Sequence, residues 1–125
     1  MPGPSFIVHF GKQILLQDFS NVLDPDEALR TIATTRGFVS ELAAKKGFVP
    51  ELLVLTTVEG SAFDPRVVSA IKDLATHHTP YVRASAIIGL NPLTRVILRL
   101  VTMVSGRSVQ PFETRQQALD WLVQQ

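Results

Sequence analysis

The sequence predicts a single α/β domain built on a mixed, mostly parallel β-sheet with helices on its faces. Three Asx-Pro pairs support this prediction, because each follows an apolar run and precedes a run of helical periodicity: Asp24-Pro25, Asp64-Pro65 and Asn91-Pro92. An Asp or Asn side chain accepts hydrogen bonds from the free N–H groups of a helix start, and proline suits the first helical turn. Strands that alternate with such helices require crossover connections and therefore run parallel. The predicted element order is ββαβαβαβα.

The first elements are a predicted hairpin and a long helix. Two β-prone runs, Phe6–Phe10 and Ile14–Phe19, are separated by a short polar turn. The helix that begins at Asp24-Pro25 is expected to end at Lys45-Lys46-Gly47, because cations and a glycine suit a helix C-terminus. Gly37 interrupts this helix and weakens it by roughly 1 kcal/mol relative to alanine.

Two interior strands are predicted in the middle of the chain. Leu52–Leu55 is apolar on both faces, as in a strand covered by helices on both sides. Tyr81–Leu90 forms the second interior strand, and its small residues let a helix pack closely. Between them a helix runs from Asp64-Pro65 to His77-His78.

The last third of the chain continues the alternation. A helix is expected from Asn91-Pro92 to about Val104. The strand that follows, Ser108–Phe112, contains Pro111, which cannot donate to a ladder, so we expect it at an edge of the sheet. A closing helix follows the N-cap Thr114.

Length and composition limit the class of protein. The chain has 125 residues, enough for one core, and we expect a flexible segment at residues 1–5 followed by one domain over residues 6–123. It has no cysteine, which excludes disulfides and thiolate sites and suits a reducing cytosol. No signal-peptide pattern is present, and no apolar run approaches the ~20 residues that span a bilayer. We therefore expect a cytoplasmic protein without a transmembrane segment.

The charge distribution argues against nucleic-acid binding and favours another partner. A net charge of +1 is too small for a polyanion binder that works by bulk electrostatics. Charged residues make up 18% of the chain, against about 25% in an average domain, so we expect apolar surface shared with a partner or a second copy. Self-association is predicted, through Leu98 and the edge strand near Pro111. No acidic residue lies between Asp73 and Glu113.

Four blocks of sequence carry a family resemblance: Pro80–Leu90, Ser105-Gly106-Arg107, Pro111–Arg115 and Ala118–Leu122. They resemble small bacterial proteins of the SpoIIAA-like, or STAS-like, group. This group is related in fold to the anti-sigma-factor antagonists and, more loosely, to CRAL-TRIO lipid-transfer domains. The resemblance implies a non-catalytic binding or regulatory module that binds a protein partner or a small or lipid ligand, without a cofactor.

The resemblance also implies where a regulatory phosphorylation would occur. The antagonists carry the modified serine at a helix start, within an Asp-Ser-Ser-Gly-type motif. The matching positions here are Asp64-Pro65-Arg66, so proline and arginine stand where the serines would be. Ser61 lies in the preceding loop, out of register, and is a weak alternative. We therefore expect no phosphoacceptor serine at this helix start.

A ligand site is predicted at the carboxyl ends of the parallel strands, where the loops after Thr57, Gly89 and Phe112 gather. Gly89 and Asn91 there form either an anion cradle or a tight turn. Asp64 is a helix cap or, less simply, a functional carboxylate. The candidate ligand-binding residues are Thr57, Asp64, Gly89, Asn91, Arg95 and Arg99.

The helix that carries Arg95 and Arg99 is amphipathic. Its apolar arc, which includes Val96, is expected to pack on the sheet. Arg95 and Arg99 lie on the opposite side, interrupted only by Leu98. This side is either a solvated face or a basic surface for an acidic partner, an anionic lipid headgroup or a second subunit. Peripheral lipid or anionic-ligand binding through Arg95 and Arg99 is therefore the alternative function.

Catalysis and metal binding are not expected. His77 and His78 are neighbours that point ~100° apart on a helix, so they cannot both reach one ion, and a role at the helix C-terminus is simpler. His9 has no carboxylate or serine nearby in sequence. A small enzyme that uses Asp64 or His9 is a third hypothesis.

Overall fold

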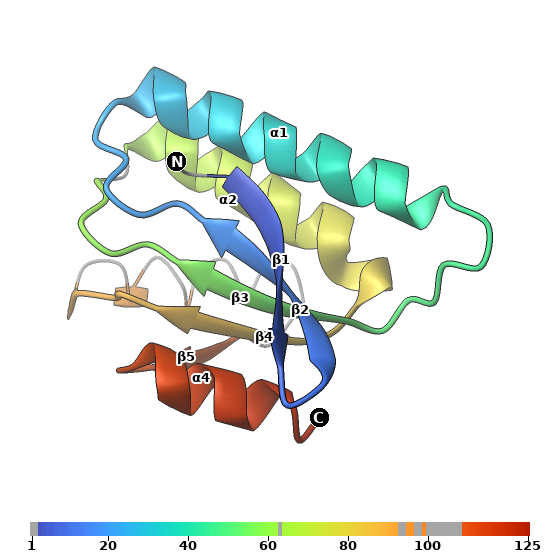
Figure 1. The fold of residues 1–125 in the computed structure, drawn as a ribbon. Coiled ribbons are helices and arrows are strands. Elements are labelled where there is room, and N and C mark those ends of the chain that lie inside the picture. The colour runs from blue at the N-terminus through green and yellow to red at the C-terminus, as the bar shows by residue number, and fades with distance from the viewer. Residues whose placement is uncertain (1–2, 63, 93–94, 97–98, 100–108) are drawn as a thin grey trace.

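A five-stranded sheet lies between two layers of helices in the computed structural model, which describes residues 3–62, 64–92, 95–96, 99 and 109–125 (Figure 1). Helices α1 and α2 cover one face of the sheet, and α4 covers the other. The strands are β1 (Gly3–His9), β2 (Lys12–Asp18), β3 (Leu52–Thr57), β4 (Val82–Ile88) and β5 (Gln110–Phe112). The helices are α1 (Pro25–Ala43), α2 (Pro65–His78), the 3-10 turn η1 (Thr79–Tyr81) and α4 (Arg115–Leu122).

The sheet is mixed and mostly parallel, which confirms the predicted fold class. Its order is β1-β2-β3-β4-β5. The β1–β2 pair is antiparallel, and the other three pairs are parallel. The predicted interior strand at Leu52–Leu55 is the middle strand β3, and the strand that contains Pro111 is an edge, as expected.

The hairpin differs from its prediction in its boundaries. Its turn is formed by Phe10 (φ 48°) and Gly11 (φ 76°), two consecutive residues with positive φ, as in a type I′ turn. β1 ends at His9 and begins at Gly3, before the predicted start at Phe6. Residues 3–5, expected to be flexible, pair with the last residues of β2. Main-chain pairing needs no apolar side chain, so the apolar pattern did not mark this part of the strand.

Three of the four predicted N-caps, Asp24, Asp64 and Thr114, make the expected side-chain hydrogen bonds. The Asp24 carboxylate accepts a hydrogen bond from Asp26 N at 3.0 Å, and the Asp64 carboxylate accepts one from Val67 N at 2.9 Å. Thr114 Oγ1 accepts from Gln117 N at 3.2 Å. These bonds confirm that the Asx-Pro pairs at residues 24 and 64 start helices.

α1 ends earlier than its cationic residues predict. Its last residue is Ala43, and Lys45 N donates to Leu42 O at 3.2 Å, which tightens the final turn. Gly47 (φ 84°) comes after this turn and redirects the chain toward β3. The prediction that Lys45 and Lys46 form the last helical turn is therefore wrong.

Each face of the sheet has its own apolar core. On one face Leu55 and Ala86 pack against Leu122 of α4. The small side chain of Ala86 lets α4 approach closely, as the sequence predicts. On the other face Leu15 and Val54 pack against α1. None of the helices in the described residues combines the length and the hydropathy that crossing a bilayer requires.

The helix after Asn91-Pro92 is described at four positions, Pro92, Arg95, Val96 and Arg99, all of them helical. Arg95 N donates to Asn91 O at 3.0 Å, which marks the first turn. Val96 is 55% exposed, although its helical position predicted burial on the sheet. Leu98, the expected helix end near Val104 and the expected strand start at Ser108 lie outside the described residues.

Candidate functional site

The loops that follow β2, β3 and β4 gather at one end of the sheet, on the left in Figure 1. Main-chain hydrogen bonds join them in sequence across the sheet. Phe19 N donates to Thr57 O at 2.9 Å, and Asn21 N donates to Glu59 O at 2.7 Å. Val58 N donates to Ile88 O at 3.1 Å. Among the described residues, these hydrogen bonds hold the three loops against one another at the predicted site.

Gly89 lies against the β3 loop. Its φ of +88° is in the left-handed region, and a Cβ built there would lie 2.5 Å from Glu59 N and 2.8 Å from Glu59 Cα. The backbone of Glu59 therefore occupies the space beside Gly89. This close approach is the packing expected of the tight-turn interpretation of Gly89.

Thr57 and Ser61 belong to the same closed network. Thr57 is the last residue of β3 and is buried. Ser61 Oγ donates to Phe19 O and accepts from Val22 N at 3.0 Å. The Ser61 hydroxyl thus holds the β2 loop against the β3 loop both as a donor and as an acceptor of hydrogen bonds. A phosphate on Ser61 would remove the hydroxyl proton that is donated to Phe19 O.

Asp64 is engaged at the start of α2. Its carboxylate accepts from Val67 N and lies 3.4 Å from Arg66 Nη2, and Arg66 also reaches Asp26 at 3.8 Å. The hydrogen bond from Val67 N, assisted by Arg66, lowers the pKa of Asp64. A carboxylate held ionised in this way is a poor proton donor near neutral pH. Its negative charge also occupies the helix start at which an anion would bind.

Asn91, Arg95 and Arg99 extend from this end of the sheet along the helix that begins at Pro92, and all three are exposed. The exposed Val96 lies between the two arginines in sequence. The structure thus brings Thr57 and Gly89 together, with Asp64 on the adjoining helix start. It leaves Arg95 and Arg99 on the surface.

A small cavity lies between the β2 loop and the two helices above it. Its volume is about 10 Å³, and its walls are apolar side chains: Phe19, Val22, Ala28, Ile32, Val67 and Ile71. A volume of this size accommodates about one water molecule. It is too small for an organic ligand.

His9 has a carboxylate partner that the sequence did not indicate. His9 Nε2 lies 2.9 Å from Asp120 Oδ1 although the residues are 111 positions apart. Gln116 Nε2 donates to the same oxygen at 2.9 Å, and these two hydrogen bonds, that of His9 first, lower the pKa of Asp120. The pair fastens the hairpin tip to α4. It lies far from Asp64, so the two residues of the enzyme hypothesis do not form one site.

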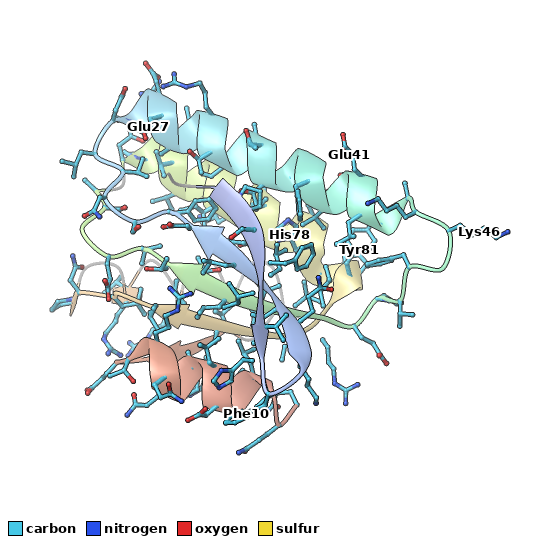
Figure 2. All side chains as sticks on the ribbon, in the orientation of Figure 1. Phe10, Glu27, Glu41, Lys46, His78 and Tyr81 are labelled. Carbon is cyan, nitrogen blue, oxygen red and sulfur yellow. The ribbon has the colours of Figure 1, made fainter. Side chains whose placement is uncertain are left out.

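His77 and His78 have different neighbours. His77 Nε2 lies 2.9 Å from Ser40 Oγ, whereas His78 is buried between the helices and the sheet (Figure 2). His78 Nδ1 lies 3.0 Å from Gln17 Nε2, and Thr56 donates to Gln17 Oε1 at 3.2 Å. Gln17 thus links the buried His78 of α2 to Thr56 of β3. Both histidines lie in the last turn of α2, as the sequence predicts, and His78 is buried there.

No cluster of three or more potential metal-ligating side chains from His, Cys, Asp or Glu occurs among the described residues.

Comparison with solved structures identifies the architecture. An uncharacterized DUF3478-family protein from Shewanella loihica PV-4, described as having a SpoIIAA-like fold, superposes with a TM-score of 0.71. The match covers 96% of this chain and 92% of that protein at 17% sequence identity. This protein has a SpoIIAA-like fold. No family model and no curated protein matches the sequence.

The SpoIIAA-like fold confirms the resemblance on which the sequence analysis relied. At this level of identity the similarity establishes architecture, and function depends on the local residues. In this SpoIIAA-like domain the start of α2 carries the capping Asp64, Pro65 and the ion-paired Arg66.

Proposed function

We propose that this SpoIIAA-like protein is a non-catalytic binding module that docks on an acidic protein partner. The supporting observation is that, among the described residues, the loops at the carboxyl ends of β2, β3 and β4 pack against one another. Small-molecule sites are concave, with volumes of about 300–1,000 Å³. The apolar cavity beside α1 and α2 is about 10 Å³. In the part of the chain that the structure describes, such a surface suits a macromolecular partner better than a small ligand.

The chemistry of the partner follows from Arg95, Val96 and Arg99. All three side chains are exposed on the helix that leaves this end of the sheet. Arginines next to exposed apolar side chains are typical of protein interfaces, where they pair with carboxylates. We therefore expect an acidic, partly apolar docking surface on the partner and binding that weakens with salt.

Charge reversal tests this proposal. Tagged protein is incubated with lysate, and the captured proteins are compared between wild type and the double variant Arg95→Glu/Arg99→Glu. The matched control is Lys45→Glu/Lys46→Glu. These two cations are also exposed, but they follow the C-terminus of α1, away from the helix that carries Arg95 and Arg99. The partner should be retained by wild type and control and lost by the arginine variant. Identical captures by all three proteins would refute the proposal.

Peripheral association with anionic lipid is the second candidate, and the exposed Val96 between two arginines favours it. A basic surface with an apolar side chain can contact headgroups and insert into the interface. The probe is co-sedimentation with phosphatidylserine-containing vesicles, with pure phosphatidylcholine as control. Binding to the anionic vesicles that disappears in Arg95→Glu/Arg99→Glu would favour lipid over protein. Absence of wild-type binding would eliminate it.

A further inference from the structure

The first strand forms an edge of the sheet that proline interrupts only near its start, at Pro4. β1 is the outer strand, and among the described residues it pairs with β2 alone. Its seven residues include no Lys, Arg, Asp or Glu. Natural edge strands are usually kept short, charged or interrupted by proline. The opposite edge, β5, follows this rule, since it has three residues with Pro111 at its centre.

The hairpin turn determines which main-chain groups face outward. In a two-residue type I′ hairpin the flanking pair, here His9 and Lys12, exchanges hydrogen bonds. Because bonded and non-bonded pairs alternate along antiparallel strands, the N–H and C=O groups of Phe6 and Val8 point away from β2. Pro4 is also an even-numbered residue, so its nitrogen faces outward like those of Phe6 and Val8. This agrees with the chemistry of proline, which has no N–H to donate to β2.

The side chains beside this edge are apolar. Phe6 packs on Phe38 of α1, with ring centroids 5.6 Å apart, so Phe6 and Val8, two positions apart, share the α1 face. Val8 is 72% exposed, and Phe10 at the hairpin tip is 79% exposed (Figure 2). An uncharged edge beside two exposed apolar side chains suits a second β-strand.

We propose that β1 pairs antiparallel with β1 of a second copy of this chain, about a twofold axis at Ile7. This register places Phe6 opposite Val8 of the second copy, and the reverse, so that each pair exchanges both N–H···O bonds. It also covers Val8 with a phenylalanine ring, places Phe10 opposite Pro4 and places His9 opposite Ser5. The two five-stranded sheets become continuous.

A second copy fits this edge because the strand is complementary to itself. Isologous contacts require one surface to match its own rotated image. The register brings no two like charges opposite each other, because β1 carries none. The only titratable side chain in the strand, His9, points to the α4 face, where Asp120 binds it. We therefore place the predicted self-association at β1 rather than at the edge strand near Pro111.

Sedimentation velocity over a range of concentrations tests the proposal with one pair of variants. Val8→Lys adds a charge next to the proposed axis, whereas Val49→Lys makes the same change at a 57% exposed position in the loop before β3. Wild type and Val49→Lys should dimerise alike, and Val8→Lys should weaken dimerisation at least tenfold. A wild type that stays monomeric at millimolar concentration would overturn the proposal, as would a dimer indifferent to Val8→Lys.

Amide hydrogen exchange by NMR provides a readout at single residues. The amides of Ile7 and His9 face β2, so they should be protected at every concentration. Those of Phe6 and Val8 should gain protection of at least tenfold only where the dimer forms. A dimer in which Phe6 and Val8 exchange as fast as in the monomer contradicts β1 pairing. Arg95→Glu/Arg99→Glu should leave the dimer intact, which separates this proposal from the proposed function.

Discussion

Replacing Gly89 by alanine tests the closed arrangement of the loops. The new Cβ would lie 2.3 Å from Glu59 Cγ and 2.5 Å from Glu59 N. The side chain of Glu59 can move, but its backbone is held by the hydrogen bond from Asn21 N. The substituted residue must also keep a φ of +88°. Two separate penalties therefore act at this position.

Both penalties can be assigned a magnitude. A left-handed conformation costs an L residue roughly 1–2 kcal/mol, and overpacking a filled site typically costs about 1–3 kcal/mol. We expect Gly89→Ala to lower the free energy of unfolding by about 2–5 kcal/mol. This is a large share of the roughly 5–15 kcal/mol that stabilises a typical domain.

Two other glycines separate the contributions. Gly11 has a φ of +76° with no atom within 4 Å of a built Cβ, so Gly11→Ala measures the backbone penalty alone. Gly37 lies inside α1, also with nothing within 4 Å, so Gly37→Ala should raise stability by about 1 kcal/mol. Urea unfolding followed by far-UV circular dichroism gives all three values. If Gly89→Ala lowers the free energy of unfolding no more than Gly11→Ala does, the inference that Glu59 packs tightly on Gly89 is refuted.

Two further predictions concern Ser61 and His77. Ser61→Ala removes both hydrogen bonds of the hydroxyl and should lower the free energy of unfolding by about 1–3 kcal/mol. Urea titration measures this change. An unchanged value would contradict the role of Ser61 in joining the two loops. Burial, assisted by Arg36, lowers the pKa of His77 below its ordinary value of 6.5, so protonation favours the unfolded chain. Stability should therefore fall as the pH decreases from about 6.5 toward the folded-state pKa, and less so in His77→Gln. Equal pH profiles of the two proteins would contradict this assignment.

Local signals in the sequence were sufficient to predict the fold class and the order of the described elements, although not the start of β1 or the end of α1. Asp24, Asp64 and Thr114 cap the helices they were expected to cap, because a cap is bonded to an N–H only two or three residues away. The interior position of Leu52–Leu55 followed from its continuous apolar run, since only a strand covered on both faces requires one. Cytoplasmic location remains a prediction.

Contacts between distant segments decided the rest. The His9–Asp120 pair joins residues 111 positions apart, and no local pattern marks such a partner. Glu59 occupies the space beside Gly89 because β3 and β4 are neighbours in the sheet. The packing at the predicted site therefore could not be read from the residues next to Gly89 in sequence. Sequence by itself determined the caps, the element order and the fold class, which rest on local hydrogen bonds and periodicity. Tertiary structure alone decided how the described loops pack on one another and which strands form the edges of the sheet, because both depend on segments that meet only after folding.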